Sequence, residues 1–174
     1  MPVLPDLLGP GLRLVICGSA AGRKSADVGA YYAGPGNRFW DVLHKFSATP
    51  RRFQPAEFPL LLALGIGLTD IVKEASGADS DLRSDQFDPI GLRARIEHHA
   101  PRILIFNGKR SASAFFGQTV DYGYQAGSDI GPTRIHVAPS TSGSARGFWD
   151  ERHWQQALMA AGFERGSRDD PKAR

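Results

Sequence analysis

The chain contains a single cysteine, Cys17, among its 174 residues, so it can form neither an internal disulfide nor a cysteine-rich metal cluster. None of its five histidines has a metal-ligand spacing from another histidine, a cysteine or a carboxylate, so we expect no metal, and no motif indicates another cofactor. No apolar run is long enough to span a membrane. The N-terminal segment also lacks a basic stretch followed by a long apolar one, so we expect a cytoplasmic protein without a signal peptide or membrane contacts.

The chain also lacks a strong excess of positive or negative charge: its formal net charge is +3 and its sequence pI is near 9.2. Such a balance permits a polyanionic partner without requiring one. The length and the 41% hydrophobic content are typical of one globular domain with a full core. We expect this domain to span residues 1–163 and to be monomeric, with residues 164–174 forming a flexible charged tail.

Short apolar segments alternate with helical patterns along the chain. Strands are predicted at residues 12–17, 66–70, 102–106 and 134–138. Helices are predicted at residues 38–46, 55–64, 89–99, 110–116 and 148–161. This alternation predicts an α/β fold, a three-layer α/β/α sandwich around a central, mainly parallel four-stranded sheet. Residues 18–36 and 71–88 are predicted as long loops, which in a compact domain are usually functional.

Two of the predicted strands run directly into loops of small residues. The first strand leads into Gly18-Ser19-Ala20-Ala21-Gly22, and the last leads into Pro139-Ser140-Thr141-Ser142-Gly143. In an open parallel sheet, ligands bind in a crevice outside the carboxyl ends of the strands. Small residues at this edge let a ligand or a sugar-phosphate backbone approach the main chain. We therefore expect both loops to line one crevice.

Four segments, in this order, resemble motifs of the uracil-DNA glycosylase superfamily, in particular those of its mismatch-specific uracil/thymine and hypoxanthine-DNA glycosylase branches. Residues 18–22 lie where that superfamily has its first motif, and Pro35-Gly36-Asn37-Arg38-Phe39-Trp40 is similar to a Pro-x-Asn-x-Phe-Trp segment of both branches. Leu68-Thr69-Asp70-Ile71-Val72 resembles a middle motif whose aspartate is typical of the hypoxanthine branch. Residues 139–142 resemble the second motif of the same branch. The resemblance extends from Leu14 to Arg146, about three quarters of the chain.

The resemblance implies a monofunctional DNA glycosylase that hydrolyses the N-glycosidic bond of a deaminated base, uracil or hypoxanthine, and leaves an abasic site. Its partner would be double- or single-stranded DNA, from which the target nucleotide is turned out into a pocket. The candidate catalytic residues are Asn37, Asp70 and Ser140. The candidate base-binding residues are Ser19, Ala20, Gly22 and Tyr32. The candidate DNA-binding residues are Ser25, Lys109, Arg110, Thr141, Ser142, Gly143 and Arg146.

Each candidate also has a purely structural alternative. Tyr32 aligns with the aromatic residue that stacks on uracil in the mismatch-specific branch, but it could instead anchor a glycine-rich loop. Asn37 could read a base edge or hold water, and it could equally cap the helix that follows. Asp70 could polarise water, accept a hydrogen bond from a base or donate a proton, or it could cap a turn. Lys109 and Arg110 could bind phosphate at a helix start or be ordinary surface charges.

The second loop has the same ambiguity, because its hydroxyl groups could contact phosphates or cap the last helix. Arg93 and Arg95 are expected on a solvated helix face. Tyr31, next to Tyr32, is expected to anchor the loop.

Three positions depart from the mismatch-specific pattern. Ala20 replaces an asparagine that orients the attacking water in that branch, and Ser140 replaces the asparagine that opens its second motif. Ser144 stands where that branch has an apolar wedge. These departures leave open a protein that binds damaged or abasic DNA without cutting it. A third hypothesis is an unrelated nucleotide-binding α/β protein, although the chain has no convincing Gly-x-Gly-x-x-Gly or Gly-Lys-Ser/Thr phosphate loop.

Overall fold

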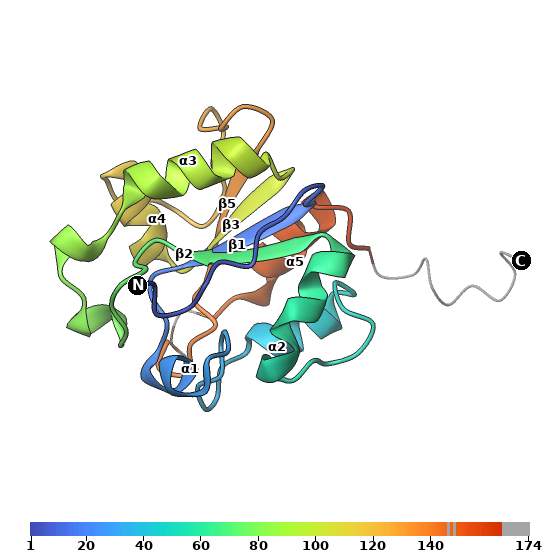
Figure 1. Cartoon of the computed structure of the whole chain (residues 1–174). Coiled ribbons are helices and arrows are strands. Elements are labelled where there is room, and N and C mark those ends of the chain that lie inside the picture. The colour runs from blue at the N-terminus through green and yellow to red at the C-terminus, as the bar shows by residue number, and fades with distance from the viewer. Residues whose placement is uncertain (146, 148, 165–174) are drawn as a thin grey trace, which may run out of the picture.

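The computed structural model describes residues 1–145, 147 and 149–164 (Figure 1). In this part of the chain, five strands form one sheet in the order β2-β1-β3-β5-β4. The strands are β1 (Leu14–Gly18), β2 (Ile66–Asp70), β3 (Ile103–Asn107), β4 (Gly123–Tyr124) and β5 (Arg134–Ala138). The α-helices are α1 (Arg23–Val28), α2 (Phe39–Lys45), α3 (Pro89–His99), α4 (Lys109–Phe116) and α5 (Glu151–Ala160). Three 3-10 helices complete the set: η1 (Pro55–Leu64), η2 (Asp79–Asp81) and η3 (Ser84–Gln86).

The sheet is mixed and mostly parallel. β1, β2, β3 and β5 correspond to the four predicted strands and pair in parallel with one another. The predicted number of strands is nevertheless wrong, because β4 adds a fifth strand that is antiparallel to β5. β4 has only two residues and no apolar run, so it carries no periodic signal, and its pairing with β5 is what makes it a strand.

Helices cover both faces of the sheet, as the apolar strands predict (Figure 1). Leu14 and Ile16 of β1 belong to the core cluster that includes the buried residues of α2 and α5. Val15 and Cys17 of the same strand belong to the opposite cluster, with the buried apolar residues of α3 and α4. Successive strand residues point to opposite faces, so a sheet buried on both sides favours apolar residues at successive strand positions.

The N-terminal segment, residues 1–8, runs along the edge strand β2, and we call it the N-terminal strap. Leu7 and Leu68 exchange two backbone hydrogen bonds of 2.9 and 2.8 Å. The N–H of Val3 donates to the carbonyl of Lys73 at 2.7 Å. The strap therefore pairs with an edge that would otherwise expose unpaired backbone groups, and it brings Asp6 close to β2.

The helices differ from prediction mainly at their ends. The loop predicted over residues 18–36 contains the short helix α1, which follows Gly22 and stops at Gly29, where φ is 68°. The last helix begins at Glu151, because the side chain of Asp150 accepts the N–H of Arg152 and caps it there. Within the described residues, no helix is both long and apolar enough to cross a membrane. The predicted tail falls almost entirely on residues 165–174, which lie outside the described residues.

Candidate active site

A cleft of about 560 Å³ opens at the carboxyl ends of β1, β2 and β3. Both small-residue loops line it, together with α1 and the segment that follows β2. The sequence-predicted residues that line the cleft are Ser19, Ala20, Gly22, Ser25, Tyr32, Asn37, Asp70, Ser140, Thr141, Ser142 and Gly143. The two loops that the sequence predicts to share one crevice therefore do so, although residues 18 and 143 are far apart in the chain.

The loops also contact each other directly. The N–H of Arg38 donates to the carbonyl of Thr141 at 2.9 Å. A Cβ atom placed on Gly143 would lie only 2.8 Å from the carbonyl oxygen of Pro35, so a side chain here would push the loops apart. The Pro35–Trp40 segment and the second loop thus form one continuous wall of the cleft.

The segment after β2 forms another wall. The N–H groups of Ile71 and Val72 donate to the carbonyls of Gly18 and Ser19 at 3.0 and 2.7 Å. Further along, the N–H of Gly77 donates to the carbonyl of Ala21 at 2.9 Å. The predicted 71–88 loop is therefore tied to the first loop by backbone hydrogen bonds, and residues 77–79 and 81 line the cleft.

Tyr32 lines the cleft in a strained conformation. Its ring stacks on that of Phe39, with the centroids 3.9 Å apart and the planes 22° from parallel. Its φ of 53° is unusual for a bulky side chain, since the left-handed region costs about 1–2 kcal/mol for an L-residue. Burial, and then the charge of Asp70, raise the pKa of its hydroxyl well above the usual range. Packing against Phe39 therefore holds the ring at the wall of the cleft.

Asp70 is the last residue of β2, and its side chain is buried at the bottom of the cleft, with 3% of the residue exposed. Its partner across the β1–β2 ladder is Gly18. A Cβ on Gly18 would lie 2.8 Å from the Asp70 Oδ1 and 3.2 Å from the Tyr32 hydroxyl oxygen, so glycine makes room for both groups. Burial is the main reason that the pKa of Asp70 is raised to about 6.

Asn37 and Ser140 line the cleft and also hold the local backbone. The Oδ1 of Asn37 accepts the N–H of Phe39 at 3.0 Å, at the start of α2, one residue later than the predicted helix start. Among the described residues nothing accepts from the Asn37 NH₂ group, which leaves it able to bind a ligand. The Oγ of Ser140 accepts the N–H of Ser142 at 3.2 Å, and its own O–H remains able to donate.

The structure adds Asn107, which sequence reasoning placed after a strand without assigning it a role. Its Nδ2 donates to the Thr141 Oγ1 at 2.9 Å, and its Oδ1 accepts the Thr141 N–H at 2.9 Å. The side chain is buried, and it lines the cleft. Its position in the sequence could have indicated this role. Asn107 ends β3, just as Gly18 ends β1 and Asp70 ends β2.

We expect Asn107→Ala to lower the free energy of unfolding by about 2–3 kcal/mol, because it leaves the buried N–H of Thr141 without its acceptor. Thr141→Val is the matched control, since it removes only the hydroxyl partner and keeps the N–H hydrogen bond. Urea unfolding of both variants measures the difference. A smaller loss in Asn107→Ala than in Thr141→Val would contradict the proposed anchoring of the second loop.

The hydroxyl groups predicted to contact DNA are largely engaged within the protein. Thr141 is buried and bound by Asn107. The Oγ of Ser25, in α1, accepts the N–H of Ala33 at 3.0 Å and so holds the segment that carries Tyr32. The hydroxyls of Ser142 and Ser144 lie 2.9 Å apart at the cleft mouth. Of these residues, Ser142 and Ser144 are placed best to meet a DNA backbone, because they are more exposed than Ser25 and Thr141.

Lys109 and Arg110 do not line the cleft. Both are exposed in the first turn of α4, and each lies over an aromatic ring. The Lys109 ammonium is 4.4 Å from the Tyr122 ring centroid, and the Arg110 guanidinium is 4.5 Å from that of Phe87. These contacts favour the interpretation of both residues as surface charges.

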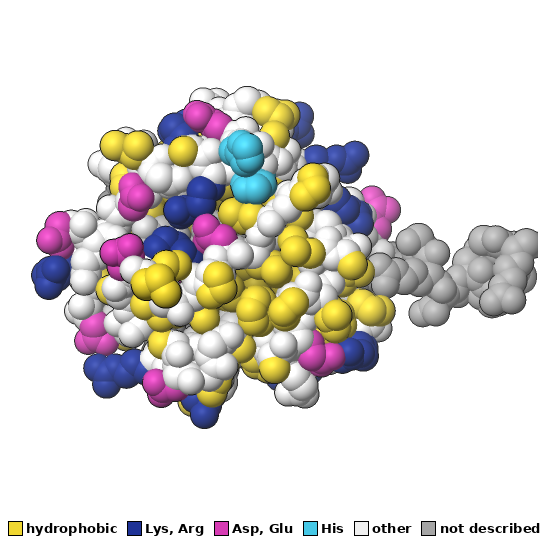
Figure 2. Space-filling view, in the orientation of Figure 1, with side chains coloured by type: hydrophobic (Ala, Val, Ile, Leu, Met, Phe, Trp, Pro, Cys, Tyr) yellow, Lys and Arg dark blue, Asp and Glu magenta, His cyan; other side chains and the backbone are white. Residues whose placement is uncertain are grey.

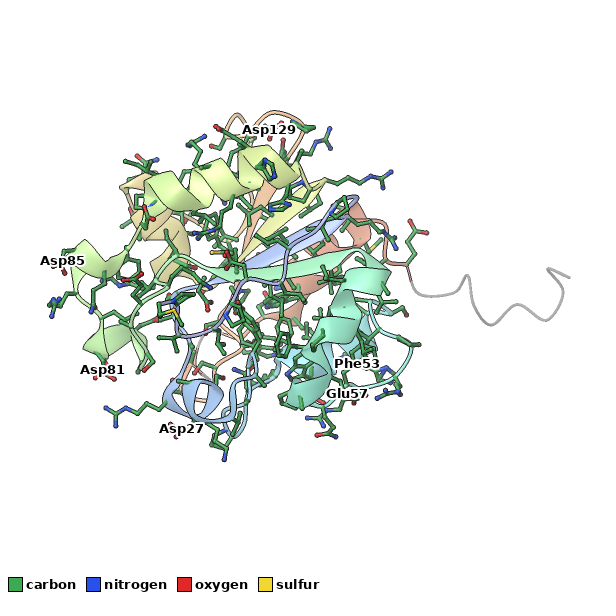
Figure 3. All side chains as sticks on the ribbon, in the orientation of Figure 1. Asp27, Phe53, Glu57, Asp81, Asp85 and Asp129 are labelled. Atoms are coloured by element: carbon green, nitrogen blue, oxygen red, sulfur yellow. The ribbon has the colours of Figure 1, made fainter. Side chains whose placement is uncertain are left out.

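Two other basic residues, Arg23 and Lys24 of α1, lie at the cleft rim. Sequence reasoning missed them because it predicted no helix there. Arg23 lies 3.9 Å from Asp81, which belongs with Asp85 to the segment after β2 (Figure 3) and lines the cleft. On the face shown in Figure 2, positive and negative side chains are interspersed around an apolar area. Arg146, the remaining candidate, lies outside the described residues.

The fold and the site together define an α/β protein with a ligand cleft at the carboxyl edge of a mostly parallel sheet. The family model described as the Uracil DNA glycosylase superfamily matches residues 5–161, so the chain belongs to that superfamily. A solution NMR structure of a protein from Methanosarcina acetivorans, described as a candidate uracil DNA glycosylase, has a similar fold. The TM-score is 0.60 at 22% sequence identity, and the match covers 92% of this chain and 96% of the other.

Proposed function

We propose that the protein is a monofunctional DNA glycosylase that removes uracil, and secondarily hypoxanthine, from DNA and leaves an abasic site. The observation that carries the proposal is the gathering of Tyr32, Asn37, Asp70 and Ser140 around one cleft at the carboxyl edge of the sheet. Membership of the Uracil DNA glycosylase superfamily supports DNA as the substrate.

The cleft suits a nucleobase that has been turned out of a DNA stack. Its volume of about 560 Å³ falls within the range of small-molecule sites, roughly 300–1,000 Å³. Tyr32 supplies an aromatic surface held rigid by Phe39, and base–aromatic stacking contributes about 1–3 kcal/mol. The backbone of residues 18–22 lines the cleft with small side chains, so a base in the cleft could come close to it.

Hydrolysis of the N-glycosidic bond produces positive charge on the sugar and negative charge on the departing base. The ionised carboxylate of Asp70 would stabilise the sugar cation and polarise the attacking water. The NH₂ group of Asn37 and the hydroxyl of Ser140 can donate hydrogen bonds to the base edge or to that water. No covalent bond to the protein is required, which makes the reaction a single displacement by water.

Incubation of the purified protein with a uracil-containing duplex, followed by heating in alkali, tests this proposal. We expect strand breaks at uracil, both in U·G and U·A pairs and in single strands, and slower breaks at hypoxanthine. An undamaged duplex of the same sequence is the control. Absence of breaks with every one of these substrates would refute the proposed glycosylase activity.

A second candidate function is binding of damaged or abasic DNA without cleavage. It is favoured by Ala20, which lines the cleft and whose methyl group cannot orient water. Under this alternative, the protein binds a uracil duplex tightly and the DNA remains intact after long incubation. The alkali assay, run beside a binding measurement on the same duplex, distinguishes the two functions.

A further inference from the structure

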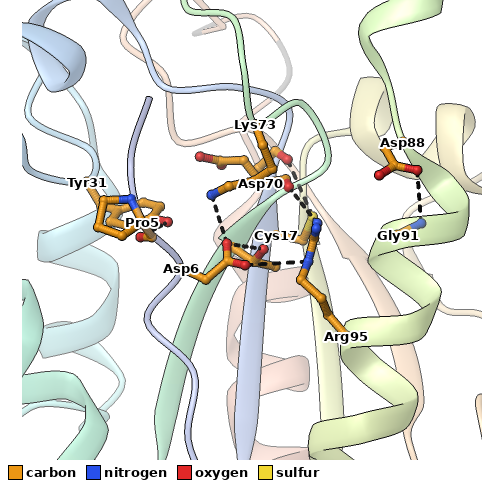
Figure 4. A network of polar contacts seen from close by, with 11 residues as sticks. Pro5, Asp6, Cys17, Tyr31, Asp70, Lys73, Asp88, Gly91 and Arg95 are labelled. Carbon is orange, nitrogen blue, oxygen red and sulfur yellow. Dashed lines mark hydrogen bonds and ion pairs between the residues drawn. The ribbon is translucent and has the colours of Figure 1, made fainter. Parts of the chain in front are cut away.

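Behind the cleft, a group of charged side chains surrounds the backbone of Asp70 (Figure 4). Asp6 of the N-terminal strap lies 2.8 Å from the Lys73 ammonium and 3.6 Å from the Nε of Arg95. The Thr69 hydroxyl donates to the Oδ1 of Asp6 at 2.7 Å. We call Asp6, Lys73 and Arg95 the charge cluster. Its members come from three separate segments, namely the strap, the residues after β2, and α3.

Arg95 links this cluster to the candidate active site. Its Nη2 donates to the carbonyl oxygen of Asp70 at 2.9 Å, while its Nε faces Asp6. The side chain of Arg95 is only 21% exposed, so the predicted position on a solvated helix face is wrong. By contrast, Arg93 of the same helix is exposed, with its guanidinium over the Phe115 ring. The orientation of α3 against β2 separates the two arginines.

We infer that Asp6, Lys73 and Arg95 position Asp70 and set the charge state in which it acts; this inference rests on the proposed role of Asp70 in glycosylase chemistry. Arg95 fixes the backbone of Asp70 through its carbonyl oxygen. Asp6 in turn holds both cations in place by its ion pairs. The three are positioning residues, because they lie behind the cleft and none of them lines it.

The groups around Asp70 determine in which direction each charge shifts its titration. The titratable groups that interact with it are Asp6, Cys17, Tyr31, Tyr32, Lys73 and Arg95. Burial raises the pKa of the Cys17 thiol and of both tyrosine hydroxyls well above their usual range, so these groups are neutral near pH 7. The neighbouring charges are therefore one anion and two cations. The anion favours the protonated form of Asp70, and the cations favour the ionised form.

Substitutions in the cluster should therefore shift the titration of Asp70 in opposite directions. Asp6→Asn keeps an oxygen for the Thr69 hydroxyl but removes the negative charge, so the midpoint should fall by about one pH unit. Arg95→Gln and Lys73→Met each remove a positive charge and should raise the midpoint by about one pH unit. A purely structural cluster would change stability without these opposite shifts.

The experiment follows Asp70 by ¹³C NMR of the side-chain carboxyl carbon in the full chain without DNA, with its resonance assigned from its loss in Asp70→Asn. The pH dependence of uracil excision is measured on the same proteins. Arg95→Lys keeps the positive charge, so its Asp70 titration midpoint should stay near that of the wild type, unlike that of Arg95→Gln. Arg93→Gln is the control on the same helix. Thermal unfolding identifies any variant that does not fold, and the remaining variants then carry the test.

Opposite shifts in Asp6→Asn and in either cation variant would establish the inference. Midpoints equal to that of the wild type in folded variants would overturn it, even where the wild type excises uracil. If the wild type excises no base, the proposed function fails, while the NMR titration still decides whether the cluster controls Asp70.

Discussion

Asp70→Asn should lower the rate of uracil excision by about 10²–10⁴-fold, the range typical of losing a group that assists water attack. The side chain keeps its size, so the cleft should stay intact while the negative charge disappears. Single-turnover excision from a uracil duplex measures the loss. For the wild type, we expect the rate to fall as the pH drops through about 6, because the acting form is the ionised carboxylate.

Asp79→Asn is the matched control for this loss. Asp79 also lines the cleft, but it is exposed at the rim, so removing its charge should leave excision within about twofold of wild type. Wild-type excision in Asp70→Asn would show that another group activates the water. An equal loss in both variants would instead point to a general electrostatic effect on DNA binding.

Asp70→Asn should also make the protein more stable at a pH where the wild-type carboxylate is ionised. The pKa of Asp70 is about 6 in the folded protein against an ordinary value of 3.8, so the folded state binds this proton more tightly than the unfolded state. At pH 8 the ionised carboxylate therefore costs about 3 kcal/mol, and the wild type regains this stability as the pH falls from above 6 to below 3.8. We expect Asp70→Asn to raise the free energy of unfolding by about 2–3 kcal/mol at pH 8 and to have little effect at pH 3.

Urea unfolding of wild type and Asp70→Asn at both pH values measures this difference. A lower free energy of unfolding in Asp70→Asn at pH 8 would mean that the ionised carboxylate stabilises the fold. That result would contradict the burial argument while leaving the test of excision unaffected.

The second large effect is expected at Tyr32. Tyr32→Ala removes the ring that Phe39 holds against the cleft, so kcat/KM for uracil excision should fall by about 5–150-fold, equivalent to the loss of about 1–3 kcal/mol of stacking. Tyr32→Phe keeps the ring and should retain the excision rate. Wild-type excision by Tyr32→Ala would place the stacking surface elsewhere in the cleft.

Removing the hydroxyl group of Tyr31 or of Tyr32 should affect the stability of the protein differently. The Tyr31 hydroxyl donates to the carbonyl of Pro5 at 2.9 Å, as expected of an anchor. The buried Tyr32 hydroxyl lies near the Asn107 side chain, but in poor hydrogen-bond geometry. Tyr31→Phe should therefore lose about 1 kcal/mol, and Tyr32→Phe should lose none or gain stability. Thermal or urea unfolding of the two variants compares them.

Much of the fold could be predicted because apolar strands and helix ends are marked locally. The bounds of β2, α3 and β5 agree with the predicted ones, and the α/β class is confirmed. Helix α1 could not be predicted, because its six residues follow a glycine with no side-chain cap and have no apolar stripe. The single domain over residues 1–163 and the monomeric state stay predictions.

The candidate site was only partly accessible from the sequence. Motif order and small-residue loops indicated the residues of the cleft, because the carboxyl ends of parallel strands meet at one edge of the sheet. Asn107 was missed because its role depends on Thr141, which lies 34 residues away and is brought close only by the pairing of β3 with β5. Lys109 and Arg110 have suitable charges and helix positions but lie outside the cleft.

The sequence by itself determined that mostly apolar strands would be buried on both faces and that two of them would end in loops facing one crevice. Only the tertiary structure decided the properties of the groups in that crevice. Burial and the charge of Asp6 raise the pKa of Asp70, while the charges of Lys73 and Arg95 lower it, and Tyr32 combines a φ of 53° with a ring stacked on Phe39. Local periodicity is a property of neighbours in the chain, whereas desolvation and charge interactions depend on which distant residues the fold brings together.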